Sequence, residues 1–437
     1  MVHFIKRVIR YLLSKIKQFK NKEVIIGKIK KEEKRIQARV LDKFDLLVKN
    51  QIGLTKEKDY ADYLLGLFYL KNESKHVVVN LLEKLSLFLF QTLNKELDTS
   101  KLESELLELA SEISYEYLSI SQWKALYYIT NLRGNFVLAN DFRKQALNKA
   151  LSYETKPKLS QKEAYYLFTA YLDENKIEEA KVLIDKLQKK IIKVLPIRKM
   201  NMYLNLFEEN SKAVFKRNKN LDKTYYNLIN GKSVAIVGPA PSDEMLGKEI
   251  DKFDIVIRLN YRGDDFMPEH NEFGSRIDVS YYNTENAKNL AKMNQIDFLK
   301  KLKFIVFKGN NELYSRFKNN KVKKLIMRDE FVFLGSLNMI PLTIIDILAY
   351  NPKRVKVFKT NFFLSKNLYA KGYQLEKNMI FSLSKRWRSF AMHNVVSQIK
   401  VVKNLYHNGR VKLDKSCQDV LDLPEKKYIK EIQRIFS

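Results

Sequence analysis

Residues 231–260 read GKSVAIVGPAPSDEMLGKEIDKFDIVIRLN, and this stretch decides the fold class. The run Val234–Val237 is short, apolar and without polar alternation, which predicts a strand covered on both faces. Gly238 ends the strand, and Ser242 is the predicted N-cap of a helix with acidic residues in its first turn. In open α/β sheets a phosphate binds where a strand leads into a helix. The expected nucleotide-binding residues of this turn are Gly238, Pro239, Ala240 and Ser242.

Short apolar runs separated by helical stretches continue for more than a hundred residues after this turn. Because strand alternates with helix, residues 231–437 are expected to form an α/β domain with a Rossmann-like, mostly parallel sheet. The last stretch, from Phe390, returns to helices. The predicted strands are Val234–Val237, Ile255–Ile257, Ile277–Ser280, Phe304–Phe307, Lys324–Met327 and Val355–Phe358.

Residues 59–230 have helical periodicity throughout, which predicts an all-α domain of antiparallel helix pairs. Residues 122–151 and 162–188 align as two weak copies, and Gly134-Asn135 of the first corresponds to Asn175-Lys176 of the second. The copies resemble tetratricopeptide hairpins, although their spacing exceeds the usual period of about 34 residues. Aromatic side chains at helical spacing usually pack in a core, with a binding surface as the alternative. The aromatic residues concerned are Trp123, Tyr127 and Tyr128.

Residues 1–58 are basic, and the first 22 of them are amphipathic, with no acidic residue before Glu23. An apolar face backed by cations is typical of a helix in the membrane interface. The same pattern fits a first helix packed on the protein's own core, and both interpretations stay open. The apolar face comprises Phe4, Ile5, Val8, Ile9, Leu12, Leu13, Ile16 and Phe19.

The 437-residue chain has a formal net charge of +30, which implies an anionic partner, either nucleic acid or an anionic membrane surface. Lys and Arg are spread through every segment without a recognition helix, so nucleic acid is not expected. The single cysteine, Cys417, excludes a disulfide scaffold and favours a reducing compartment. With neither an apolar run of about 18 residues nor a signal-peptide pattern, we expect a cytoplasmic protein, peripheral on the inner face of the membrane.

The second half of the opening stretch joins two acidic pairs to a second strand that ends in Arg258-Leu259-Asn260, followed by FGSRIDVSYYN at 273–283. This pattern resembles the large sialyl motif of the eukaryotic-type sialyltransferase family, in a divergent bacterial branch. The resemblance implies that Asn260 binds the nucleotide or phosphate of a CMP-sugar. Arg258 either contacts that donor or pairs with Asp251 or Asp254 as part of the structure. The family has an Asn after the glycine, where this chain has Pro239.

A second motif, FVFLGSLNMIPLTIIDILAYNPKRVKVFKTNFFL at 331–364, predicts a loop, a helix from Pro341 and a strand. Gly335, Ser336 and Asn338 precede the helix, where hydroxyl, amide and backbone N–H groups can hold a phosphate or ribose. The small motif of the sialyltransferases occupies the corresponding place. This chain lacks both the Pro-Ser/Thr-x-Gly turn and the Tyr-Gly-Phe ending of that motif.

His393 is the candidate general base, since histidine titrates near neutrality and sugar transfer to a hydroxyl needs a base. Its alternative role is to cap the helix that follows. The last motif of the family is a His followed five residues later by Glu, where this chain has Gln398. We expect His407 to be a C-terminal helix cap and His270 to lie in a solvated loop. Asp264-Asp265 lacks the Asp-x-Asp spacing of a metal site, so neither a metal nor another cofactor is expected.

Together these motifs predict an inverting glycosyltransferase that moves an acidic sugar, sialic acid or Kdo, from a CMP-activated donor. The expected acceptor is a cell-surface glycan or glycolipid, as in capsule or lipooligosaccharide biosynthesis. The alternative is a non-catalytic scaffold, in which helical repeats precede a degenerate nucleotide-binding domain.

Overall fold

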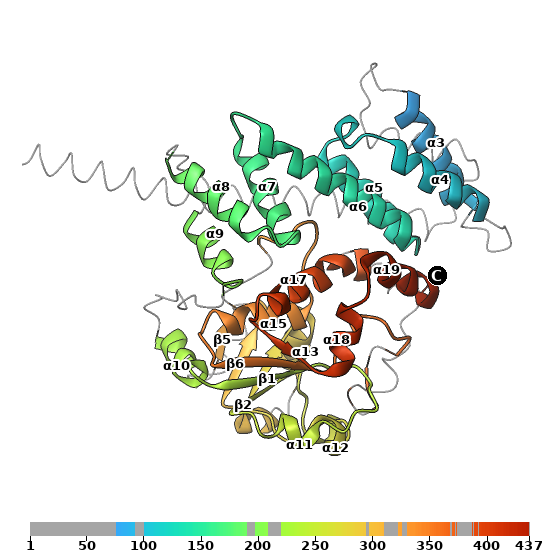
Figure 1. The fold of residues 1–437 in the computed structure, drawn as a ribbon. Helices are drawn as coiled ribbons and strands as arrows, with labels where there is room; N and C mark the ends of the chain where they lie inside the picture. The colour runs from blue at the N-terminus through green and yellow to red at the C-terminus, as the bar shows by residue number, and fades with distance from the viewer. Residues whose placement is uncertain are drawn as a thin grey trace, which may run out of the picture.

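The computed structural model of the chain describes most of residues 76–436 (Figure 1). The basic segment 1–58, with its predicted amphipathic helix, lies outside the described residues. The described ranges are 76–91, 100–189, 197–208, 220–293, 297–309, 322–325, 330–367, 369–371, 373, 387, 389–391 and 393–436.

The described part of the second half contains a seven-stranded sheet in the order β5-β4-β3-β2-β1-β6-β7, with every neighbouring pair parallel. The predicted α/β fold with a Rossmann-like parallel sheet is therefore confirmed. The strand order reverses beside β1, which lies between β2 and β6. The strands are β1 Ser233–Val237, β2 Ile255–Leu259, β3 Val279–Tyr282, β4 Phe304–Phe307, β5 Val322–Lys324, β6 Arg354–Phe358 and β7 Lys412–Leu413.

The apolar runs form strands because both faces of the sheet are covered. Ile236 pairs with Ile257 on one side and Val357 on the other, and all three contribute to the larger core beneath α15 and α17. Ala235 and Val256 face the opposite layer, which the one-turn helices α11 and α12 close. The helices of these layers are α10 Asn220–Ile229, α11 Gly247–Ile250, α12 His270–Phe273, α13 Thr284–Lys292, α15 Met339–Leu348 and α17 Val395–His407.

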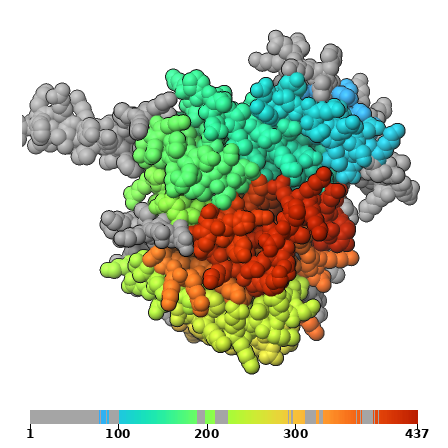
Figure 2. All heavy atoms as spheres, in the orientation of Figure 1, coloured from blue at the N-terminus to red at the C-terminus, as the bar shows by residue number. Residues whose placement is uncertain are grey.

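Helices are the only regular secondary structure in the described part of residues 76–208, and they pack above the C-terminal helices of the chain (Figures 1 and 2). Consecutive helices pack against one another, α5 with α6 and α7 with α8. No helix of the described residues is both long and apolar enough to cross a membrane. The helices are α3 His76–Gln91, α4 Ser100–Glu112, α5 Ile120–Asn131, α6 Phe136–Leu151, α7 Gln161–Asp173, α8 Ile177–Lys189 and α9 Ile197–Leu204.

The two aligned copies turn in the same way between their helices. Gly134 and Asn175 both have positive φ, 76° and 56°. The next residues, Asn135 and Lys176, donate their N–H groups to Thr130 and Tyr171 five residues back. Asn tolerates the left-handed region better than other non-glycine residues, which explains why it can stand where the first copy has Gly. The expected core role of the aromatic residues is confirmed, because Trp123, Tyr127 and Tyr128 are all buried.

The sheet unit begins earlier than the boundary predicted at residue 231. The ring of Tyr225 on α10 packs edge-on against Phe304 of β4, with centroids 4.8 Å apart. Its hydroxyl lies 2.9 Å from that of Tyr281, which donates to Asp346 on α15. α10 therefore belongs to the α/β unit, because its buried aromatic face packs under the sheet.

Helix α17 joins the two halves of the molecule. It packs on α15 below and on α7 above (Figure 1). Asn404 of α17 donates from Nδ2 to the carbonyl of Leu172 at 2.8 Å, satisfying a backbone acceptor at the end of α7. The C-terminal helix α19 Glu425–Phe436 adds a second contact with α6, and α18 Lys415–Leu421 precedes it.

Candidate functional site

The turn after β1 runs along the chain that follows β6, at the point where the strand order reverses. The N–H of Gly238 donates to the carbonyl of Phe358 at 2.8 Å, and that of Ala240 to the carbonyl of Lys359 at 3.0 Å. A Cβ atom at residue 238 would lie 2.4 Å from the Lys359 carbonyl oxygen, so only glycine fits this close approach. The amides of Gly238 and Ala240 are therefore engaged within the protein, while the half-buried Pro239 lies between them.

The predicted helix N-cap at Ser242 is wrong, because α11 begins only at Gly247 and is a single turn long. The hydroxyl of Ser242 instead accepts from the N–H of Glu244 and from Nζ of Lys359, both at 3.2 Å. Nζ of Lys359 also binds the carbonyls of Ser242 and Glu244 at 3.1 and 2.6 Å. Because these carbonyls accept from the lysine, they do not accept the backbone hydrogen bonds of a helix that starts at residue 243.

Lys359, which follows β6, was not predicted as a site residue. It is fully buried, has φ 55°, and places its ammonium 4.8 Å from the ring centroid of Phe273. Burial lowers the pKa of this ammonium. Its position directly after a strand at the reversal of strand order is the signal that could have found it. Lys359 puts a positive charge behind the turn at 238–242.

Arg258 has a structural role. Its guanidinium is buried and donates to the carbonyls of Phe273, Gly274 and Arg276, at 2.6 to 3.0 Å. Burial lowers its pKa to about 10. Of the two open roles, the contacts favour the structural one: no direct ion pair joins Arg258 to Asp251 or Asp254 within the described residues, but the nearby charge of Asp251 acts to raise the pKa of Arg258 against the effect of burial. The Asp251 carboxylate binds the N–H groups of Ser275 and Arg276, and Asp254 binds Ser233 at the start of β1.

Asn260 directly follows β2, at the carboxyl end of that strand. Its φ is 50°, and its N–H donates to the carbonyl of Tyr281 at 2.8 Å. Its Oδ1 accepts from the N–H of Asn283 at 3.2 Å, which joins the carboxyl ends of β2 and β3. Asn260 is half-buried, so it lies at the rim of this edge.

The structure brings together the two C-terminal motifs that the sequence singled out. Ser336 Oγ lies 3.4 Å from Nδ1 of His393, 57 residues further along the chain. Gln398 cross-links the same two segments: its Oε1 accepts from the N–H of Asn338 at 2.9 Å, and its Nε2 donates to the carbonyls of Ser336 and His393. An ionised Glu at this position could accept but could not donate, so both contacts require the amide of Gln398.

This pair of segments lies at the carboxyl edge of the sheet. Lys308 directly follows β4, and its Nζ donates to the carbonyl of Leu337 at 3.2 Å. Helix α15 begins there at Met339, two residues before the predicted start at Pro341, which instead occupies its first turn. Asn338 is its N-cap and accepts from the N–H of Ile340 at 3.2 Å. Proline fits a first turn because its missing N–H would have no helical partner there.

His393 does not cap α17. The N-cap is Asn394, whose Oδ1 accepts from the N–H of Ser397 at 3.1 Å. The imidazole of His393 is half-buried and directed through Nδ1 at Ser336. When Nδ1–H donates to the serine oxygen, Nε2 carries the lone pair that a general base needs.

The other predicted histidine and acidic positions lie apart from this pair. His270 is exposed as predicted, but it begins the one-turn helix α12 and does not lie in a loop. The predicted cap at His407 is wrong by one residue, because His407 is the exposed last residue of α17 and Asn408 is the C-cap. Asp264 binds Lys301 and the hydroxyl of Tyr261. Within the described residues, no three His, Cys, Asp or Glu side chains gather as a metal site would require.

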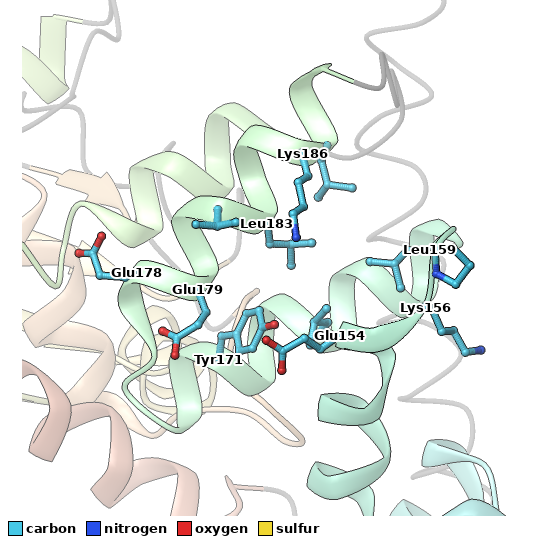
Figure 3. Close-up of a pocket in the computed structure, with 12 residues that line it drawn as sticks. Glu154, Lys156, Leu159, Tyr171, Glu178, Glu179, Leu183 and Lys186 are labelled. Carbon is cyan, nitrogen blue, oxygen red and sulfur yellow. The ribbon is translucent and has the colours of Figure 1, made fainter.

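A groove of about 430 Å³ lies in the helical region (Figure 3). Leu183 and Lys186 of α8 face Tyr171 of α7 across it, and none of the predicted site residues lines it. It therefore does not belong to the carboxyl-edge site.

No protein-family model and no curated protein matches this chain. The functional assignment rests on the residues of the carboxyl edge.

Proposed function

We propose that the chain is a metal-independent, inverting glycosyltransferase that transfers sialic acid or Kdo from a CMP-activated donor to a glycan or glycolipid acceptor. One observation carries the proposal. Turn 238–242, Asn260, loop 335–338 and His393 come from four segments, and their contacts place them along the carboxyl edge of one parallel sheet. Ligands of open α/β proteins bind at that edge.

In this mechanism His393 takes the proton of the acceptor hydroxyl while the oxygen attacks the anomeric carbon and CMP departs. Attack opposite the leaving group inverts the configuration. Ser336 holds the imidazole through Nδ1, so that Nε2 faces the hydroxyl. The leaving group carries one phosphate, whose charge is stabilised by the dipole at the N-terminus of the ten-residue helix α15, since the N–H groups of Asn338 and Ile340 are bound by the side chains of Gln398 and Asn338.

The contacts also divide the predicted donor-binding residues into two groups. Asn260, Gly335, Ser336 and Asn338 remain the proposed polar contacts of CMP. Asn260 and Asn338 would contact it through Nδ2, since Oδ1 of each already accepts from a backbone N–H. Turn 238–242 is proposed to shape the crevice through its backbone course and Pro239, since its amides at 238 and 240 and the Ser242 hydroxyl are engaged. Arg258 supports the site from behind.

The first test is incubation with CMP-sialic acid and CMP-Kdo, with released CMP as the readout. CMP should also raise the melting temperature, whereas UDP and GDP should not, because only a ligand of the folded state stabilises it. The expected stabilisation is about 2.7 kcal/mol at a hundredfold excess over Kd. An absence of both CMP release and a CMP-specific shift would refute the transferase.

The second candidate, a non-catalytic scaffold, is favoured by the engaged amides of Gly238 and Ala240, which cannot hold a phosphate. In this alternative the helices of 100–189 bind a peptide as tetratricopeptide-like repeats. The CMP experiment separates the two, since a scaffold with a degenerate nucleotide domain would neither release CMP nor be stabilised by it.

We also propose a cytoplasmic location, peripheral on the inner membrane face, with the basic residues 1–22 as the anchor. The full chain should float with anionic vesicles, and a chain lacking residues 1–22 should bind them several-fold less. Neutral vesicles serve as the control. Equal flotation of both chains would show that residues 1–22 are not the anchor.

A further inference from the structure

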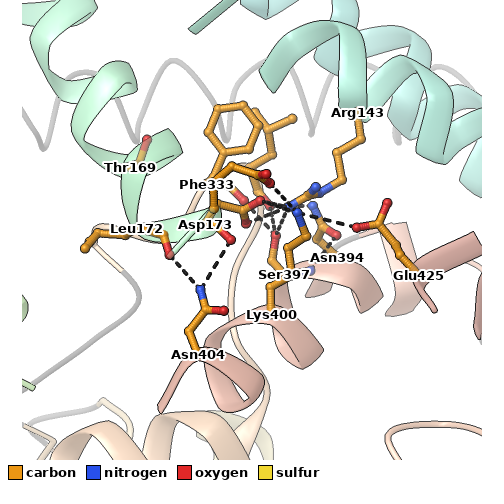
Figure 4. A network of polar contacts seen from close by, with 12 residues as sticks. Arg143, Thr169, Leu172, Asp173, Phe333, Asn394, Ser397, Lys400, Asn404 and Glu425 are labelled. Atoms are coloured by element: carbon orange, nitrogen blue, oxygen red, sulfur yellow. Dashed lines mark hydrogen bonds and ion pairs between the residues drawn. The ribbon is translucent and has the colours of Figure 1, made fainter. Parts of the chain in front are cut away.

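A polar network joins the helical region to Asn394 and Ser397, which follow the candidate base His393 in the chain (Figure 4). Arg143 on α6 is fully buried, and its Nη2 lies 2.6 and 2.7 Å from the two carboxylate oxygens of Asp173 on α7. The same Nη2 donates to Oγ of Ser397 at 3.3 Å. Ser397 belongs to the first turn of α17, four residues after His393. A single guanidinium therefore joins both helical hairpins to the segment that carries the candidate base.

Ser397 also binds the two segments that carry Ser336 and His393. Its Oγ donates to the carbonyl of Phe333 at 2.7 Å, and its N–H binds the side chain of Asn394. Asn394 donates from Nδ2 to the carbonyl of Leu334 at 2.7 Å. The hydroxyl of Ser397 thus fixes loop 333–335 against the start of α17.

The backbone on both sides of the pair needs such support. Asn394, next to His393, has φ 28°, and Leu334 has φ 43°. Gly335 has φ 104°, and a Cβ at this position would lie 2.7 Å from Cβ of Asn394. Non-glycine residues hold such conformations only where surrounding contacts impose them. The network around Ser397 supplies these contacts.

Arg143 stays charged within this interface. Burial lowers the pKa of its guanidinium, but Asp173 and Glu425 outweigh burial, so that its pKa is raised. Lys400 of α17 also binds Asp173, at 3.2 Å, and Glu425, at 3.4 Å. Buried ion pairs often add little net stability, since desolvation opposes the attraction. Stability alone is therefore a weak reason for this network, whereas fixing one geometry of α17 is a sufficient one.

We propose that Arg143 and Ser397 are positioning residues for His393, so that the helical hairpins of residues 120–189 form part of the catalytic apparatus. The proposal rests on the proposed function, because it assigns His393 its role as base. Neither residue touches the reacting atoms. They set the direction of the imidazole through the loop and through the first turn of α17.

The test variant is Ser397→Ala, which removes the hydroxyl and keeps the pair of Arg143 with Asp173. We expect kcat for CMP release to fall at least tenfold, with KM for the CMP-sugar within twofold of the wild type, since a small displacement of a catalytic group is costly. Ser397→Thr restores the hydroxyl and should recover most of kcat. The matched control is Asn408→Ala, which removes a contact to Asn175 of 2.8 Å in the same interface. Along the helix axis, residue 408 lies about 16 Å from Ser397.

A second measurement follows His393 without turnover. The chain has five histidines, and comparison with His393→Asn assigns the imidazole resonances of His393. Ser397→Ala should shift these resonances and their titration, whereas Asn408→Ala should not. If the wild type transfers neither sugar, the proposed function fails while the resonances still decide the positioning role. Unchanged resonances in Ser397→Ala, or a kcat equal to that of Asn408→Ala, would overturn it.

Discussion

Replacing His393 by alanine should lower the rate of sugar transfer by about 10²- to 10⁴-fold, the range that a general base contributes. The reason is geometric. The imidazole is half-buried, and its Nδ1 lies 3.4 Å from Oγ of Ser336. The contacts of Lys308 and Asn338 hold this pair at the carboxyl edge of the sheet. No second histidine of the described residues approaches this position. Initial rates of CMP release, at saturating donor and acceptor, measure the effect.

The same variant should keep its donor site and its fold. Asn394, not His393, caps α17, so the helix keeps its N-terminal hydrogen bond when the imidazole is removed. CMP should therefore stabilise His393→Ala about as much as the wild type. His407→Ala is the control, because His407 is exposed at the far end of the same helix. A His393→Ala rate within threefold of the wild type would exclude His393 as the base.

Sequence patterns predicted most of the sheet, because a parallel strand that is covered on both faces consists of consecutive apolar residues. Phe304–Phe307 was predicted to the residue, and Val234–Val237 was one residue short of β1. Residues 277–280 were predicted two residues early, since Ile277 is apolar but precedes the first pair of the strand. Two-residue β7 is too short for any periodicity. The prediction Lys324–Met327 is wrong in its bounds, since β5 is Val322–Lys324 and shares only Lys324 with it. Local patterns therefore detect the strands but misplace where they begin and end.

The candidate site was predictable only where a residue acts through local chemistry. Ser336, Asn338 and His393 were found because hydroxyl, amide and imidazole groups stand beside a predicted helix start. The contacts that decide the role of Ser242 join residues 117 positions apart. Ser242 is a good N-cap by local preference, but Nζ of Lys359 binds its hydroxyl and its carbonyl.

The role of Arg143 could not be predicted from local sequence either, because its contact with Ser397 joins residues still further apart in the chain. Arg143 lies 254 positions before Ser397, in a segment whose sequence indicates only helices. Periodicity places a charged residue on the solvent side of a helix, yet this one is fully buried. Only the assembled interface, with Asp173 opposite and Ser397 below, gives the guanidinium its partners.

Replacing Gly238 by alanine should destabilise the protein by about 1–3 kcal/mol, the usual cost of overpacking, and should abolish the CMP-dependent rise in melting temperature. The added Cβ would lie 2.4 Å from the carbonyl oxygen of Lys359 and 3.2 Å from that of Phe358. Both neighbours are backbone, so the clash is relieved only if the chains after β1 and β6 separate. Separation breaks the hydrogen bonds from Gly238 and Ala240.

The separation should also reach the donor crevice. Pro239 accepts from the N–H of Ala370 at 2.7 Å, so a displaced turn also moves Ala370. Asn260, at the end of the neighbouring strand β2, should keep its own contacts. The loss of donor binding should therefore come from the changed shape of the turn. Differential scanning fluorimetry with and without CMP measures both effects.

Gly231→Ala is the matched control, because that glycine stands at the opposite end of β1, where an added Cβ would meet no atom within 4 Å. Its φ of 69° makes alanine unfavourable by conformation alone, at a cost of about 1–2 kcal/mol, without any steric clash. Gly231→Ala should therefore lose stability but keep its CMP response. If Gly238→Ala keeps the full CMP response as well, the turn does not shape the donor crevice, and Asn260 with loop 335–338 would have to bind CMP without it.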